Sequence, residues 1–118
     1  MIYPASIKSY RYKDGTDYSI SSSSPATLVL DGPLVVKSIS FTLVMSAANA
    51  SYGHLEVLDG SSMVAKLGES NYMGYYPSVF RVNLPGAGIR FDTSLMFNVS
   101  AVSSVGLICT NINIGYQR

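Results

Sequence analysis

The side chains that could do chemistry in this chain are few and lie far apart in the sequence. The only histidine, His54, stands beside Glu56, and the only cysteine, Cys109, lies in a different and apolar segment. Catalysis by histidine needs a nucleophile to activate or a metal with further ligands, and these residues form neither pattern. We therefore expect His54 to be a solvated surface residue and Cys109 to be a buried, unreactive thiol.

Carboxylates are the other groups that could serve in catalysis or metal binding. The Asp-Gly-Thr-Asp sequence at 14–17 lacks the alternating carboxylates and the distant glutamate of a calcium loop, so we interpret it as a turn. Asp31, Asp59 and Asp92 each end an expected strand, where aspartate stabilises turns. Two of them could still meet as the acid and nucleophile of a glycan hydrolase, which remains a third hypothesis. The sequence otherwise predicts a non-enzymatic protein with no catalytic residue, no cofactor and no metal.

The bulk composition narrows the choice of partners. Eight Lys and Arg against seven Asp and Glu give the 118 residues a formal net charge of +1, too small to gather nucleic acid. The longest apolar stretch, 34–45, is interrupted by polar residues and is shorter than the ~18 residues of a membrane helix. The first residues lack the basic and apolar regions of a secretory signal, so we expect an intact start. We predict no nucleic-acid or membrane partner, and contact with other proteins instead.

The segment 68–77 has the most unusual local composition in the chain, because it combines glycine and asparagine with Tyr72, Tyr75 and Tyr76. Tyrosine offers a large contact area and a polar tip at low ordering cost, and glycine and asparagine let a loop fit its partner. We expect these three tyrosines to contact a partner. The alternative is a long inter-strand loop whose aromatic side chains fold back over one open end of the fold.

The N-terminal segment 5–13 is expected to be an edge strand or a contact arm, because apolar and polar residues alternate in it until an Asp-Gly turn. A period of two places Lys8, Tyr10 and Tyr12 on one face and the cations Arg11 and Lys13 on the other. That separation of cations counts against a base-stacking platform for nucleic acid. We expect Lys8, Tyr10 and Tyr12 to form a second partner contact.

The candidate residues described above would be positioned by strands. Short stretches in which apolar and polar residues alternate, separated by Gly, Pro, Asp and Ser, mark these strands in the sequence. Residues typical of strands dominate the stretches, and helical periodicity is hard to find. The expected strands cover residues 7–13, 26–30, 34–44, 54–59, 63–67, 79–84, 89–91, 95–99 and 107–114. Their spacing predicts one all-β domain over residues 1–118, an antiparallel two-sheet sandwich of the jelly-roll kind with eight or nine strands.

Two local expectations follow from the alternation. In 34–44 the odd positions are mostly apolar, so that Val35, Ile39, Phe41 and Leu43 should face the core, with Lys37 intruding. Strand 63–67 should end at Gly68.

Several phrases of the sequence resemble small β-sandwich virion proteins of tailed bacteriophages, of the capsid decoration or cement kind. The phrases are Ser-Ile-Ser-Phe at 38–41 after the Asp-Gly-Pro turn at 31–33, Leu-Glu-Val-Leu-Asp-Gly at 55–60, Leu-Pro-Gly-Ala-Gly-Ile-Arg-Phe-Asp at 84–92, and the closing strand that ends Gly-Tyr at 115–116. The resemblance spans roughly residues 26 to 116 and consists of turns and strands. It implies a jelly-roll-like module, commonly trimeric, that binds the outside of a capsid and braces neighbouring subunits.

Two functional expectations follow. The first is a structural virion protein, made in the host bacterial cytoplasm and located on the capsid surface, with the major capsid protein and copies of itself in a homotrimer as partners. The alternative is a receptor- or carbohydrate-binding module of a phage head or tail fibre, with a glycan stacked on the tyrosines. The absence of tryptophan counts against the alternative.

Overall fold

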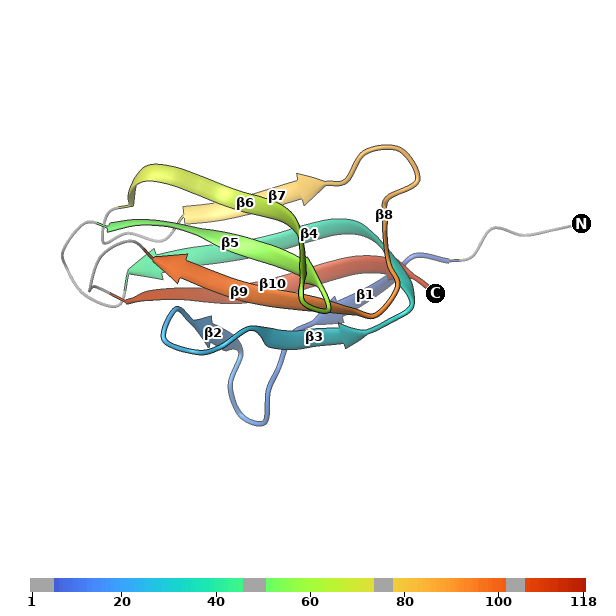
Figure 1. Cartoon of the computed structure of the whole chain (residues 1–118), viewed down its shortest axis with the longest axis horizontal. Coiled ribbons are helices and arrows are strands. Elements are labelled where there is room, and N and C mark those ends of the chain that lie inside the picture. The colour runs from blue at the N-terminus through green and yellow to red at the C-terminus, as the bar shows by residue number, and fades with distance from the viewer. Residues whose placement is uncertain (1–5, 46–50, 74–77, 102–105) are drawn as a thin grey trace, which may run out of the picture.

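The computed structural model describes residues 6–45, 51–73, 78–101 and 106–118, and these contain ten strands and no helix (Figure 1). The strands are β1 (Lys8–Arg11), β2 (Ser19–Ser21), β3 (Thr27–Asp31), β4 (Leu34–Met45), β5 (Ser51–Asp59), β6 (Ser62–Met73), β7 (Ser78–Asn83), β8 (Ile89–Phe91), β9 (Ser94–Ala101) and β10 (Leu107–Gln117). Every pairing between them is antiparallel. The all-β class and the two-sheet sandwich expected from the sequence are therefore confirmed.

The strand order is that of a jelly roll. One sheet runs β1-β10-β4-β7, with β2 also pairing with β10 and β8 also pairing with β4, and the other runs β3-β9-β5-β6. If β1 with β2 and β7 with β8 are each counted as one interrupted strand, the eight resulting strands lie in the orders 1-8-3-6 and 2-7-4-5. The structure has ten strands where eight or nine were expected because β2, which pairs with β10, was not among the expected strands.

The two sheets share one hydrophobic core. The largest fully buried side chains come from the inner faces of both sheets: Leu34, Ile39, Phe41, Leu43, Leu55, Phe91, Leu95, Phe97, Leu107, Ile112 and Ile114. Side chains alternate between the inner and outer face along each strand. In β9, Leu95, Phe97 and Val99 point inward, while Asn98 between the last two is partly exposed. The sandwich is a packed scaffold whose outer faces remain available to partners.

One expectation about β4 is wrong. Leu34 and Val36 are buried and Val35 is only partly buried, whereas the odd positions 39, 41 and 43 are buried as expected. The pairing of β4 with β10 shifts register here, since Ser38 pairs with Gly115 but Val36 pairs with Tyr116. A bulge of this kind adds one residue to one strand and reverses which face its side chains occupy. Lys37 therefore does not enter the core, and its ammonium donates to the backbone carbonyl of Ala87.

The second wrong expectation concerns Gly68, which does not end its strand. Leu55 pairs with Leu67 and Gly53 with Ser70, so β6 has one more residue than β5 between these pairs. Gly68 has a φ of +67°, the left-handed conformation that a glycine bulge uses. The strand bends at this point and continues to Met73.

Candidate functional surfaces

The only histidine takes part in a polar cluster on the outer face of the smaller sheet. His54 Nε2 lies 3.1 Å from Glu56 Oε2, and Asn98 Nδ2 donates to Glu56 Oε1 over 2.8 Å. Hydrogen bonds from Asn98 and His54 hold the pKa of Glu56 below its ordinary value. Only 15% of the His54 side chain is exposed, so the expectation of a solvated histidine is wrong. Glu56 thus links His54 on its own strand, β5, to Asn98 on the paired strand β9.

The only cysteine is not part of this cluster, because it lies in the core on a strand of the other sheet. Cys109 is fully buried within β10, and burial raises the pKa of its thiol to about 12. A thiol with so high a pKa holds almost no thiolate at neutral pH. The expected burial of Cys109 is confirmed, and its lack of reactivity stays a prediction.

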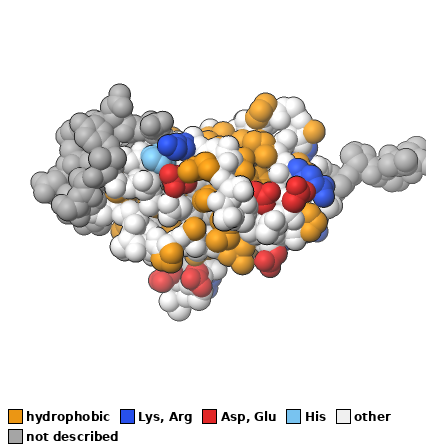
Figure 2. Space-filling model, in the orientation of Figure 1, with side chains coloured by type: hydrophobic (Ala, Val, Ile, Leu, Met, Phe, Trp, Pro, Cys, Tyr) orange, Lys and Arg blue, Asp and Glu red, His pale blue; other side chains and the backbone are white. Residues whose placement is uncertain are grey.

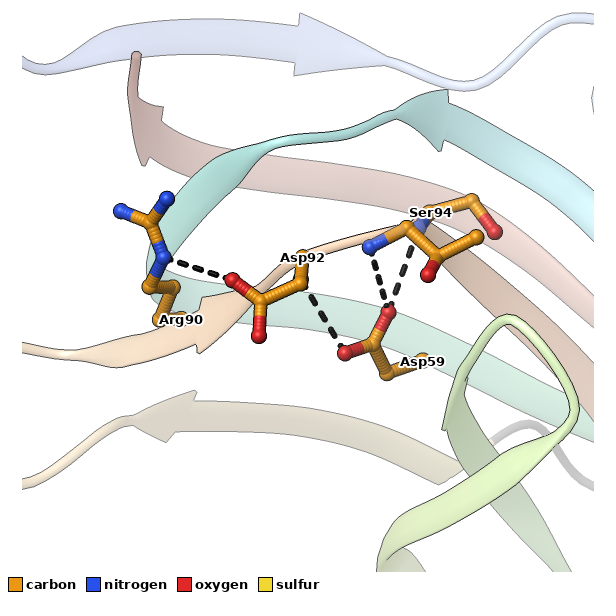
Figure 3. A network of polar contacts seen from close by, with 5 residues as sticks. Asp59, Arg90, Asp92 and Ser94 are labelled. Carbon is orange, nitrogen blue, oxygen red and sulfur yellow. Dashed lines mark hydrogen bonds and ion pairs between the residues drawn. The ribbon is translucent and has the colours of Figure 1, made fainter.

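Two of the strand-end aspartates form a structural clamp rather than an open pair of carboxylates (Figure 3). Asp59 accepts three backbone N–H bonds from the loop that joins β8 to β9 and from the start of β9: one from Asp92 at 3.0 Å, one from Thr93 at 2.9 Å and one from Ser94 at 3.2 Å. The bonds from Thr93 and Asp92 hold the pKa of Asp59 below its ordinary value. Asp92 in turn accepts from Arg90 Nε at 2.7 Å. Asp59 therefore ties the end of β5 to this loop.

No metal centre is assembled in the parts of the chain that the structure describes, where no three His, Cys, Asp or Glu side chains gather. Asp14 and Asp17 bond to each other through their backbones at 2.7 and 2.8 Å, which makes 14–17 the turn expected from the sequence.

The first set of predicted contact residues lies largely outside the described residues. Tyr75 and Tyr76 fall within 74–77, and of Tyr72 only the backbone, within β6, is described. The expectation that these tyrosines contact a partner therefore stays a prediction.

The second set is divided by the fold. β1 pairs only with β10 and is the edge strand that the sequence predicted. Lys8 is exposed on it and Tyr10 is partly buried against the core, but Tyr12 is a core residue with 3% of its surface exposed. Tyr12 lies beyond the end of β1, where its N–H donates to the carbonyl of Ile112. The Tyr12 ring is therefore buried within the protein, and the prediction that Tyr12 contacts a partner is wrong.

A feature that sequence reasoning missed crosses the outer face of the smaller sheet. Pairing aligns four hydrophobic residues, one from each strand, in the order Leu28, Met96, Leu58, Met63, which we call the apolar row. Leu28 at one end is 47% exposed and Met63 at the other is 48% exposed. Figure 2 shows hydrophobic side chains across the middle of this face, with charged ones to either side.

The apolar row could not be predicted from the sequence, because its four residues are far apart in the chain. Each occupies an outward position of its own strand, and a single exposed apolar residue is ordinary on a protein surface. Their alignment depends on the register of three strand pairs, including a bulge at Val64 that brings Met63 opposite Leu58. Val64, 38% exposed, lies beside the row and extends it.

No family model, curated protein or solved structure matches this chain. Among the described residues no helix has the length and hydrophobicity needed to cross a bilayer.

Proposed function

We propose that this protein binds the outside of a phage capsid and stabilises the assembled shell, as a decoration or cement protein. The observation that carries the proposal is the apolar row on the smaller sheet, which stays in water in the isolated chain. Removing such surface from water favours association. Each half-exposed leucine or methionine would contribute roughly 1 kcal/mol, about half the value for burying a fully exposed side chain.

The stabilising effect follows from linkage. A protein that binds the assembled shell more tightly than free subunits adds its binding free energy to the assembled state. The two-sheet core holds the apolar row on four paired strands, so that little conformational freedom is lost on binding. The proposed partners are the major capsid protein and two further copies of this chain in a homotrimer. Lys8 and Tyr10, on the exposed edge of the larger sheet, are proposed as a second contact.

The experiment compares shells that lack this chain with shells to which the purified protein is added. We expect the added protein to raise the temperature at which the shells melt. Met63→Lys places a charge at the exposed end of the apolar row and should abolish binding and the temperature shift. Thr16→Lys makes the same charge change in the exposed turn 14–17 and should leave both unchanged.

Equal shell melting with and without bound protein would refute the stabilising role. Shell binding that Met63→Lys leaves intact would refute the role of the apolar row. Light scattering of the purified protein tests the homotrimer, and a monomer at all concentrations would refute that part of the proposal.

The second candidate function, a receptor- or carbohydrate-binding module, is favoured by one separate observation. The outer face of the larger sheet carries a polar hollow lined by Arg81, which forms no ion pair with any carboxylate that the structure describes.

A further inference from the structure

The polar hollow lies on the sandwich face opposite to the apolar row, where β7, β4 and β10 run side by side. It has a volume of about 230 Å³, and the residues around it include Ser40, Thr42, Val79, Arg81, Asn111 and Asn113. Two hydroxyls, two amides and one guanidinium thus surround a shallow space. This is a concentration of hydrogen-bonding groups of the kind that fixes a small ligand.

A bulge in β10 shapes the hollow. Thr110 pairs with Thr42 and Asn113 with Ser40, so β10 has two residues between these pairs where β4 has one. Asn111, one of the two, has a φ of 53° and is the only residue other than glycine with a positive φ in the described part of the chain. Bulges re-aim side chains and are frequent beside binding sites. Asn113 Nδ2 donates to the backbone carbonyl of Asn111 over 3.1 Å, which fixes the Asn113 side chain against the bulge.

Arg81 gives the hollow a positive charge, and no described carboxylate of the protein neutralises it. Arg81 is exposed, and none of the described carboxylates lies within ion-pair distance of it, since the ion pairs found there join His54 to Glu56 and Arg90 to Asp92. Strand pairing aligns Arg81, Ser40, Asn113 and Arg11 across the sheet, so a second arginine occupies the far end of the same row, with its guanidinium 4.8 Å from the centre of the Tyr18 ring. A ligand with a negative charge complements this arrangement.

We propose that the polar hollow binds an acidic sugar, a monosaccharide unit that carries a carboxylate. The Arg81 guanidinium pairs with the sugar carboxylate in the two-bond geometry that arginine and carboxylates share. Ser40, Asn111 and Asn113 hydrogen-bond to the ring hydroxyls. The inference does not rest on the capsid role, because the hollow and the apolar row lie on opposite faces and a capsid-bound protein would keep the hollow open to solvent.

A sugar acid fits better than the carboxylate of a protein side chain for two reasons. The neutral hydroxyl and amide groups outnumber the single cation in the hollow, and they match a ligand with several hydroxyls around one charge. Val79, which is 66% exposed at the rim, offers an apolar surface to the C–H face of a sugar ring. The hollow's volume of about 230 Å³ suits one sugar ring rather than a longer segment.

The test measures binding of methyl glucuronide and of N-acetylneuraminic acid to the full chain by NMR, with methyl glucoside as the uncharged control. The expected result is saturable binding of at least one acid, with a Kd of roughly 1 mM, as suits a shallow site for one sugar, and no binding of the glucoside at roughly 10 mM. Arg81→Gln should weaken the binding by at least about tenfold, because it removes a charge-assisted pair.

Two further variants test the sugar site independently of Arg81→Gln. Asn111→Gly removes the amide while it permits the positive φ, so we expect weaker sugar binding without a lower melting temperature. Lys66→Gln makes the same charge change as Arg81→Gln on the opposite sheet and should leave sugar binding unchanged.

Absence of binding by either acid at roughly 10 mM, or binding that survives Arg81→Gln, would overturn the proposal. N-acetylglutamic acid α-amide serves as a probe for a glutamate side chain of a protein. If it binds in the hollow and neither sugar acid does, the proposal is overturned in favour of an acidic protein partner. None of these results bears on the shell-melting experiment, so the two proposals fail independently.

Discussion

Replacing Gly68 by alanine tests the bulge that carries β6 past its expected end. A Cβ atom at this position would lie 3.2 Å from Phe41 Cε2 and Cζ and 3.2 Å from Phe80 Cδ2. Those two rings stack on each other with their centroids 5.2 Å apart and their planes at 22°. Phe41 is buried, so it has little room to yield, whereas Phe80 is only partly buried.

Two costs add up in Gly68→Ala. An L-residue in the left-handed region costs about 1–2 kcal/mol. The close approach to the ring pair adds about 1 kcal/mol, the lower end of the cost of overpacking, because the rings must shift by only a few tenths of an ångström. A total of about 2–3 kcal/mol in the free energy of unfolding corresponds to a fall of roughly 10 °C in the melting temperature for a domain of this size.

Gly86→Ala is the matched control. Gly86 has a φ of +61° but nothing within 4 Å of an added Cβ, so this variant pays the backbone cost alone. Thermal unfolding followed by circular dichroism, together with urea unfolding, should show the larger loss for Gly68→Ala. Equal losses in the two variants would refute the packing of Gly68 against Phe41 and Phe80. A Gly68→Ala protein as stable as the wild type would refute the bulge itself.

Two more predictions concern groups that titrate. The backbone N–H groups of Thr93 and Asp92 lower the pKa of Asp59, so its stabilisation is present above the ordinary aspartate pKa of about 3.9 and is lost as the pH falls through the lower folded value. Asp59→Asn should therefore lower the urea midpoint near neutral pH and lessen its decline in acid; an unchanged acid decline would contradict the clamp. Cys109 should react with a thiol reagent only after unfolding, and rapid labelling of the native protein would contradict its burial.

Alternation along single strands was readable from the sequence. In β9 and in 55–57 of β5 the apolar residues at alternate positions are the buried ones, because a residue's face follows from its parity when no bulge intervenes. Turn residues located the strand ends with similar success, as with Asp59 and the Asp-Gly-Pro turn at 31–33.

The errors fall where cross-strand pairing overrides local pattern. The shift beside Lys37 depends on how β4 pairs with Gly115 and Tyr116 of β10, far later in the chain, so local alternation placed Val35 in the core instead of Val36. Tyr12 is similar: alternation correctly placed it on one face with Tyr10, but only the packing of the two sheets decided that this face lies against the core.

The sequence by itself determined the all-β class, the antiparallel sandwich, the sites of most turns and the burial of Cys109, because each depends on residues close together in the chain. Only the tertiary structure decided the apolar row and the polar hollow. Each of these surfaces takes its residues from three or four strands that are distant in sequence, and the register between those strands is fixed by bulges and by core packing over the whole domain.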